Sequence, residues 1–139
     1  MLLELNNKKI GKIYEDKLCN ILKNEGYWVH LFAVSQAGQP CDIIAVRKNE
    51  AIFIDAKHCA GKRFPFKDIQ SNQITCFEYN YSLGNICCGF AIWFDEIQEF
   101  RWLSYKKLWE CLKDLKKSIS YDELMSFKDA VEYDIRCCL

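Results

Sequence analysis

The sequence is poor in the residues and runs that mark several classes of protein. It has only 2 Pro and 6 Gly in 139 residues, and 50% of its residues are apolar, so its composition is not that of a disordered or low-complexity chain. No apolar run approaches the roughly 20 residues that a membrane-spanning helix needs. The first residues also lack the charged and then apolar order of a signal peptide. We therefore expect a cytoplasmic protein with no membrane partner.

Cysteine and histidine patterns typical of zinc sites are also missing from the sequence. The chain has 9 Cys but no C-x-x-C pair, and its two histidines, His30 and His58, stand far from any zinc-like spacing. An odd number of cysteines in mostly apolar contexts argues against a secreted disulfide scaffold. We interpret the cysteines as small buried residues that stay reduced in a cytosol.

The length is that of one domain. We expect this domain to span residues 1–139, with a core from about 8 to 117 and a C-terminal helical extension from about 118 to 139. Apolar residues at helical spacing predict helices at about 8–26, 67–81, 104–117 and 121–131. Aromatic and β-branched runs predict strands at 27–34, 41–47, 51–58, 85–95 and 99–103, with loops at 35–40 and 58–66. The order αβββαββα predicts an α/β fold in which a mixed sheet of about five strands is flanked by helices.

Two carboxylates and a lysine stand inside strand-like apolar segments. Asp42 lies in the segment 38–45, and Asp55 and Lys57 lie in the segment 51–57. Each charge is costly to bury without a partner. Side chains alternate along a strand, so Asp55 and Lys57 point to the same face, and a hairpin between the two segments brings Asp42 toward Asp55.

Two neighbouring carboxylates repel each other unless a cation neutralises them. Mg²⁺ or Mn²⁺ suits the position because these cations prefer oxygen ligands and keep several waters. This chemistry predicts a metal-dependent hydrolase of phosphodiesters. Lys57 would orient or deprotonate the attacking water, or stabilise the developing negative charge. The ordinary alternatives are that Asp42 caps a turn and that Asp55 and Lys57 form a surface ion pair.

Two helices offer further candidates. Glu15, on the first helix, could reach the site as a metal ligand or a supporting carboxylate, although an ordinary solvated helix residue is an equal alternative. Gln73, on the second helix, could hold a phosphate oxygen or Lys57.

The net charge is zero, but the charges are unevenly distributed. Residues 1–75 carry 11 Lys/Arg against 8 Asp/Glu, whereas residues 76–139 carry 8 against 11. If some of the first acids surround a metal, the remaining surface is basic and suited to phosphates. The candidate DNA-binding residues are Lys8, Lys9, Lys12, Lys62, Arg63 and Lys67.

At these residues the chain resembles the PD-(D/E)xK nuclease superfamily and, within it, the Holliday-junction resolvases. The segments 38–45 and 52–57, with twelve residues between Asp42 and Asp55, look like the metal motif of archaeal-type resolvases. The stretch from Phe53 to Lys57, together with Phe64-Pro65-Phe66 and Asn72-Gln73-Ile74, is similar to the RecU resolvases of Gram-positive bacteria and their phages. The resemblance spans roughly residues 10–120 and implies a restriction-endonuclease-like fold.

The resemblance also implies roles for single residues. It implies that Asp42 and Asp55 bind Mg²⁺, that Lys57 assists catalysis, that Gln73 supports the site and that Glu15 contributes from the first helix. The implied activity is the resolution of four-way junctions by symmetric nicking in bacterial or phage recombination and DNA repair. A homodimer fits this activity, because a junction has two-fold symmetry.

Two alternatives stay open. The chain has only a short loop where RecU proteins carry a long stalk insertion associated with junction binding. Another nuclease of the superfamily, acting on flaps, ends or restriction sites, is therefore the first alternative. The second is a catalytically inactive DNA- or protein-binding module with the nuclease fold. The intact set of Asp42, Asp55 and Lys57 argues against this module.

Overall fold

The computed structural model describes residues 2–32, 39 and 41–138, with the side chains of residues 11–32, 39 and 41–136. The helices are α1 (Leu2–Asn24), α2 (Ser71–Ser82), α3 (Tyr105–Lys113) and α4 (Phe127–Glu132), with the 3-10 turns η1 (Phe66–Asp68), η2 (Tyr121–Glu123) and η3 (Ile135–Cys138). The strands are β1 (Trp28–Leu31), β2 (Ile43–Arg47), β3 (Glu50–Cys59), β4 (Arg63–Pro65), β5 (Cys88–Phe94), β6 (Glu99–Ser104), β7 (Ser118–Ser120) and β8 (Met125–Ser126).

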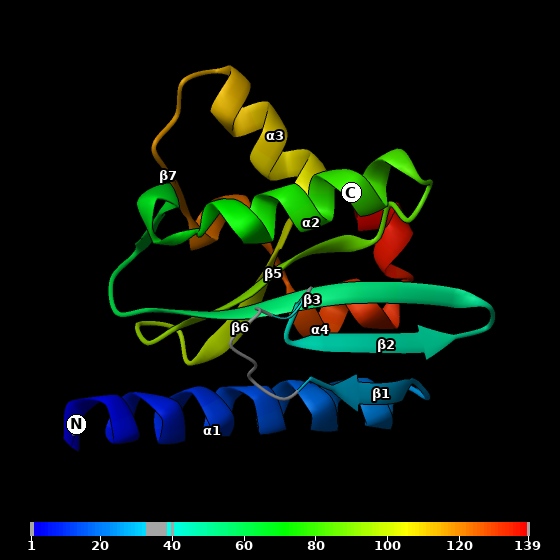
Figure 1. The fold of residues 1–139 in the computed structure, drawn as a ribbon, viewed down its shortest axis with the longest axis horizontal. Coiled ribbons are helices and arrows are strands. Elements are labelled where there is room, and N and C mark those ends of the chain that lie inside the picture. The colour runs from blue at the N-terminus through cyan, green and yellow to red at the C-terminus, as the bar shows by residue number, and fades with distance from the viewer. Residues whose placement is uncertain (1, 33–38, 40, 139) are drawn as a thin grey trace.

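The main sheet is mixed and is flanked by helices, which confirms the predicted fold class. Its strand order is β1-β2-β3-β5-β6-β8. Strands β3 and β5 run parallel, with α2 in the crossover between them, whereas the other neighbours are antiparallel (Figure 1). The described chain has six strands in this sheet where about five were expected, because Met125 pairs with Trp102 and adds β8 beside β6.

Helices cover both faces of the sheet and create two apolar cores. Leu18 and Leu22 of α1 lie in one core together with Phe127 of α4. Phe77 of α2 and Leu108 of α3 lie in the other core. Figure 1 shows α1 on one side of the sheet and the α2 and α3 pair on the opposite side. The sheet is therefore buried in its middle, where β3 and β5 meet.

A tight turn fixes the register of the hairpin that carries the candidate residues. Lys48 and Asn49 join β2 to β3 and both adopt positive φ, at 52° and 67°. Such a two-residue turn matches the twist of antiparallel strands. It sets Ile43 opposite Ile54, so residues 42 and 55 lie at the same end of the hairpin.

Long-range pairing changes two predicted segments. The predicted loop 58–66 contains β4, which pairs antiparallel with β7. The predicted helix 121–131 is α-helical only from Phe127: residues 121–123 form the 3-10 turn η2 and residues 125–126 form β8. Ser126 accepts a hydrogen bond from the Asp129 amide (3.1 Å) and caps α4. Helix α3 likewise ends at Lys113 rather than near 117. Local caps set the ends of α3 and α4, whereas β4 and β8 depend on pairing with β7 and β6, segments distant in sequence that local spacing does not reveal.

The seven cysteines whose side chains the structure describes carry free thiols, and all of them except the partly exposed Cys76 are buried. Within the same part, no helix combines the length and apolarity needed to cross a lipid bilayer.

Candidate active site

The hairpin brings Asp42 and Asp55 together. The Asp42 amide donates to the Ile54 carbonyl (3.1 Å), and the Asp42 carboxylate accepts from the Ala56 amide through Oδ2 (2.8 Å). These two bonds join Asp42 to the residues before and after Asp55, so Asp42 lies beside Asp55. Gln39 donates to the other Asp42 oxygen at 3.2 Å. Gln39 was part of the sequence motif but was given no role there; its position three residues before Asp42 was the available signal.

Asp55 is a buried carboxylate with an unused oxygen. Only 3% of its surface is exposed, and its Oδ2 has no hydrogen-bond partner among the described residues. Burial, the charge of Asp42 and a side-chain hydrogen bond with Asp42 raise the pKa of Asp55 to about 8, against the opposing effect of Lys57. A buried oxygen of this kind is costly unless something pairs with it. A divalent cation with a preference for oxygen ligands fits the position.

Lys57 is held by Gln73. The Lys57 ammonium donates to Gln73 Oε1 at 2.9 Å, and the same oxygen accepts the Gln70 amide at 3.1 Å. Gln70 is the residue that precedes α2, so the start of α2 is tied to the lysine of β3. The prediction that Gln73 could hold Lys57 is confirmed. Ile54 and Ala56 of β3 pack in the core that contains Leu18, whereas Lys57 Nζ lies 6.0 Å from the ring centroid of Phe90 in the other core, as the alternation along a strand predicts.

Glu15 lies close enough to Asp42 to feel its charge. Burial and the charge of Asp42 raise the pKa of Glu15 to about 7. Asp16 adds to the increase and Lys12 opposes it. Across residues 11–32, 39 and 41–136, however, no three Asp, Glu, His or Cys side chains form a group arranged to hold a metal ion. The described geometry is thus a two-carboxylate pair with a third carboxylate nearby.

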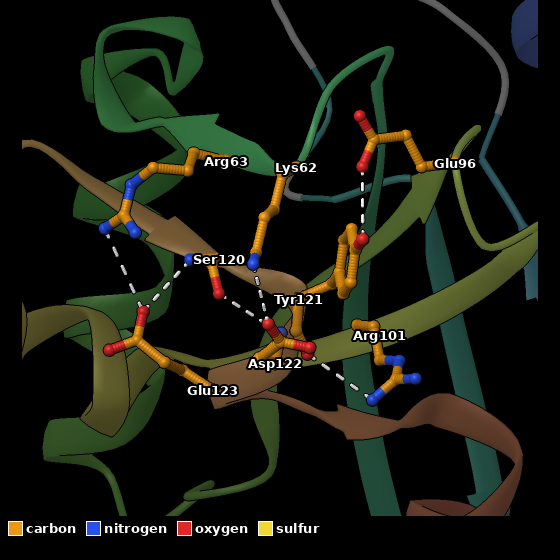
Figure 2. Close-up of polar contacts among 8 residues, drawn as sticks. All are labelled: Lys62, Arg63, Glu96, Arg101, Ser120, Tyr121, Asp122 and Glu123. Carbon is orange, nitrogen blue, oxygen red and sulfur yellow. Dashed lines mark hydrogen bonds and ion pairs between the residues drawn. The ribbon is translucent and has the colours of Figure 1, made fainter.

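The candidate DNA-binding residues differ in their surroundings. Lys62 pairs with Asp122 at 3.0 Å, and Arg63 lies 3.9 Å from Glu123 (Figure 2). Lys12 and Lys67 are exposed. The side chains of Lys8 and Lys9 lie outside the described residues, as does Pro40.

Sequence reasoning missed one side-chain hydrogen bond beside the site. His58, adjacent to Lys57, lies 2.8 Å from Asp95 through Nε2 and stacks on Tyr14 at a centroid distance of 5.2 Å. Tyr14 precedes Glu15 on α1. The pair therefore ties the end of β3 to the residue after β5 and supports the helix that carries Glu15.

Comparisons with known proteins agree with this fold. The family model of Recombination protein U (RecU) matches residues 10–139. None of the curated proteins compared with the chain matches it. Among solved structures, Hjc of Archaeoglobus fulgidus, a Holliday junction resolvase from an archaeal hyperthermophile, is similar with a TM-score of 0.65 and 15% identity. That match covers 86% of this chain and 98% of the Hjc chain. Because the family model spans nearly the whole described fold, the chain belongs to the RecU family.

Proposed function

We propose that this protein is a metal-dependent endodeoxyribonuclease that resolves four-way DNA junctions by nicking opposing strands symmetrically. Membership of the RecU family supports the substrate, and the Hjc-like fold is compatible with it. The observation that carries the chemistry is the buried Asp55 beside Asp42, with one oxygen that no described residue satisfies. Its setting would be recombination and repair in a bacterial or phage-infected cell.

The carboxylates would hold the metal, and Lys57 would stabilise the negative charge that develops on the phosphate. Asp42 and Asp55 are the proposed Mg²⁺ ligands, with Mn²⁺ as a substitute and Glu15 as a further ligand. When bound, the ion supplies Lewis acidity toward the phosphate and a water of lowered pKa. Lys57 Nζ, fixed by Gln73 Oε1, is suited to donate to a phosphate oxygen and to stabilise the charge of the transition state.

Protons must leave this site before it can hold a cation. The pKa values of Asp55, about 8, and Glu15, about 7, place both groups partly in their acid forms near neutral pH. Deprotonation of Asp55 frees the oxygen that has no other described partner. Deprotonation of Glu15 makes its carboxylate available as the further ligand. We therefore expect activity to increase from mildly acidic to mildly alkaline pH.

We also propose that two copies act together. The edge strand β1 exposes Trp28 (62%) and Leu31 (37%), and Trp28 stacks with His30 along the same strand. An exposed edge with large apolar side chains is a common place for a second chain to bind. A homodimer with a two-fold axis would present two equivalent sites to the two-fold symmetric junction.

A cleavage assay tests the proposal. Purified protein with Mg²⁺ should cut a synthetic four-way junction at paired positions on opposing strands and leave linear duplex largely intact. Cutting should stop when the metal is chelated. Equal cutting of junction, flap and linear duplex would instead identify a less selective nuclease of the same fold. Junction binding without any cutting in Mg²⁺ or Mn²⁺ would identify a binding module.

Gln73 holds Lys57 through its side-chain oxygen. Replacing it with Ala removes the acceptor that holds Lys57, and misplacement of a catalytic group by about 1 Å can lower the rate by roughly a hundredfold. We expect kcat on the junction to fall about ten- to a hundredfold with little change in KM. Gln73→Glu keeps a side-chain oxygen at this position and should restore most of the rate. Equal kcat for the Ala variant and the wild type would contradict the positioning role.

A further inference from the structure

Two pairs of basic residues lie at the two ends of the small sheet formed by β4 and β7, and their surroundings differ. Lys62 and Arg63 stand at its start, and Lys67 follows its end. Across the two-stranded sheet, Pro65 pairs with Ser118, and the Phe66 amide donates to the Lys117 carbonyl at 2.9 Å. Lys67 and Lys117 therefore belong to neighbouring stretches of backbone at one end of this small sheet.

Surface carboxylates of the same chain pair with Lys62 and Arg63. Figure 2 shows Lys62 directed at Asp122 and Arg63 directed at Glu123, with Ser120 between them. Arg63 is held further by Ser118, whose hydroxyl accepts from Nε at 2.9 Å. The turn that carries the acids is anchored as well: Arg101 donates to the Leu124 carbonyl at 2.8 Å. The acidic turn is thus fixed in place over Lys62 and Arg63.

The second pair has no such neutralisation. Lys67 and Lys117 are both exposed, and neither forms an ion pair with a residue in the described ranges. Lys67 lies three residues before Gln70, whose amide bonds the oxygen that holds Lys57. A strand of DNA that reached the candidate site could therefore continue over these lysines.

We infer that Lys67 and Lys117 bind the phosphates of a DNA arm next to the candidate site, and that Lys62 and Arg63 do not, because Asp122 and Glu123 occupy them. The inference rests on the proposed function and refines it. It removes Lys62 and Arg63 from the DNA-binding residues expected from the sequence and keeps Lys67. It adds Lys117, which lies in the acidic half of the chain. A cation that contacts a phosphate releases a counterion from the DNA, whereas a cation that stays paired with a carboxylate of its own chain releases none.

The salt dependence of binding distinguishes the two pairs. Affinity for a synthetic four-way junction is measured by fluorescence anisotropy over a series of salt concentrations, with chelator present to prevent cutting. In Lys67→Gln/Lys117→Gln, the slope of log Kobs against log salt should become shallower by about 2 per bound protomer, since each phosphate contact contributes about 0.9.

The matched control replaces both partners of each ion pair. The variant Lys62→Gln/Arg63→Gln/Asp122→Asn/Glu123→Gln loses two cations and two anions, so its net charge is unchanged, and its slope should stay within about 0.5 of the wild type. A wild-type slope in Lys67→Gln/Lys117→Gln would overturn the inference while the proposed function stands. A control that loses as much slope as that variant would overturn it too. A wild-type protein that does not bind the junction at all would remove the proposed function as well.

Discussion

Replacing Asp55 with Asn should abolish junction cleavage, lowering the rate by at least about a thousandfold, which corresponds to roughly 4 kcal/mol of transition-state stabilisation. The change keeps the size of the side chain but removes the negative charge that would hold the metal. Asp55 is buried and its Oδ2 has no partner among the described residues, so we expect no other group to substitute for it. Single-turnover cleavage of the labelled junction in Mg²⁺ measures the effect.

A matched variant separates this effect from a general loss of acidic charge. Asp129, at the start of α4, is exposed and belongs to a different part of the fold, so Asp129→Asn should cut at the wild-type rate. Junction affinity, measured with chelator present, should be close to the wild-type value in both variants. Wild-type cleavage by Asp55→Asn would remove Asp55 from the proposed site.

The metal-free protein should be more stable at pH 5 than at pH 8. The pKa of Asp55 is raised from 3.8 to about 8 in the folded state. Between these values the unfolded chain has lost the proton and the folded chain keeps it, so stability decreases as the pH rises. Each pKa unit corresponds to 1.36 kcal/mol, and we expect this group to lower the free energy of unfolding by roughly 2–4 kcal/mol between pH 5 and pH 8. Glu15 has its pKa raised to about 7 and acts in the same direction.

Chemical denaturation at the two pH values, with chelator present, tests this dependence. Asp55→Asn carries no ionisable group at the position, so its stability should change much less with pH and should exceed that of the wild type at pH 8. Addition of Mg²⁺ should stabilise the wild type more at pH 8 than at pH 5, because the ion competes with protons for the carboxylates. A wild-type stability that rises from pH 5 to pH 8 without metal would contradict the buried, protonated state of Asp55.

The hairpin and its charged residues were predictable because their signals are local. Alternation along β3 fixes Asp55 and Lys57 on one face, and the short connection at Lys48 and Asn49 predicts antiparallel pairing that carries Asp42 to the same end. The contact of Gln73 with Lys57 was also predictable, because the helical spacing of the segment 67–81 predicts a helix that packs on the sheet. These features need only neighbours within a few residues or one hairpin.

The features that escaped prediction depend on distant partners. Strand β4 exists because Ser118–Ser120 pairs with it, and Lys62 is neutralised by Asp122, sixty residues further along the chain. The sequence shows Lys62 as one charge in a basic segment and Asp122 as one charge in an acidic segment. Only the fold brings them together. The metal roles of Asp42, Asp55 and Glu15 remain predictions for the experiments above.

Gln73 Oε1 accepts two hydrogen bonds, one from the Gln70 amide at the start of α2 and one from the Lys57 ammonium. If the first turn of α2 frays on warming, Gln73 moves away from the Gln70 amide, and the hydrogen bond that positions Lys57 is lost at the same time. Heat inactivation would then precede global unfolding. A ligand that binds and stabilises the first turn of α2 would raise the temperature at which activity is lost without contacting the substrate.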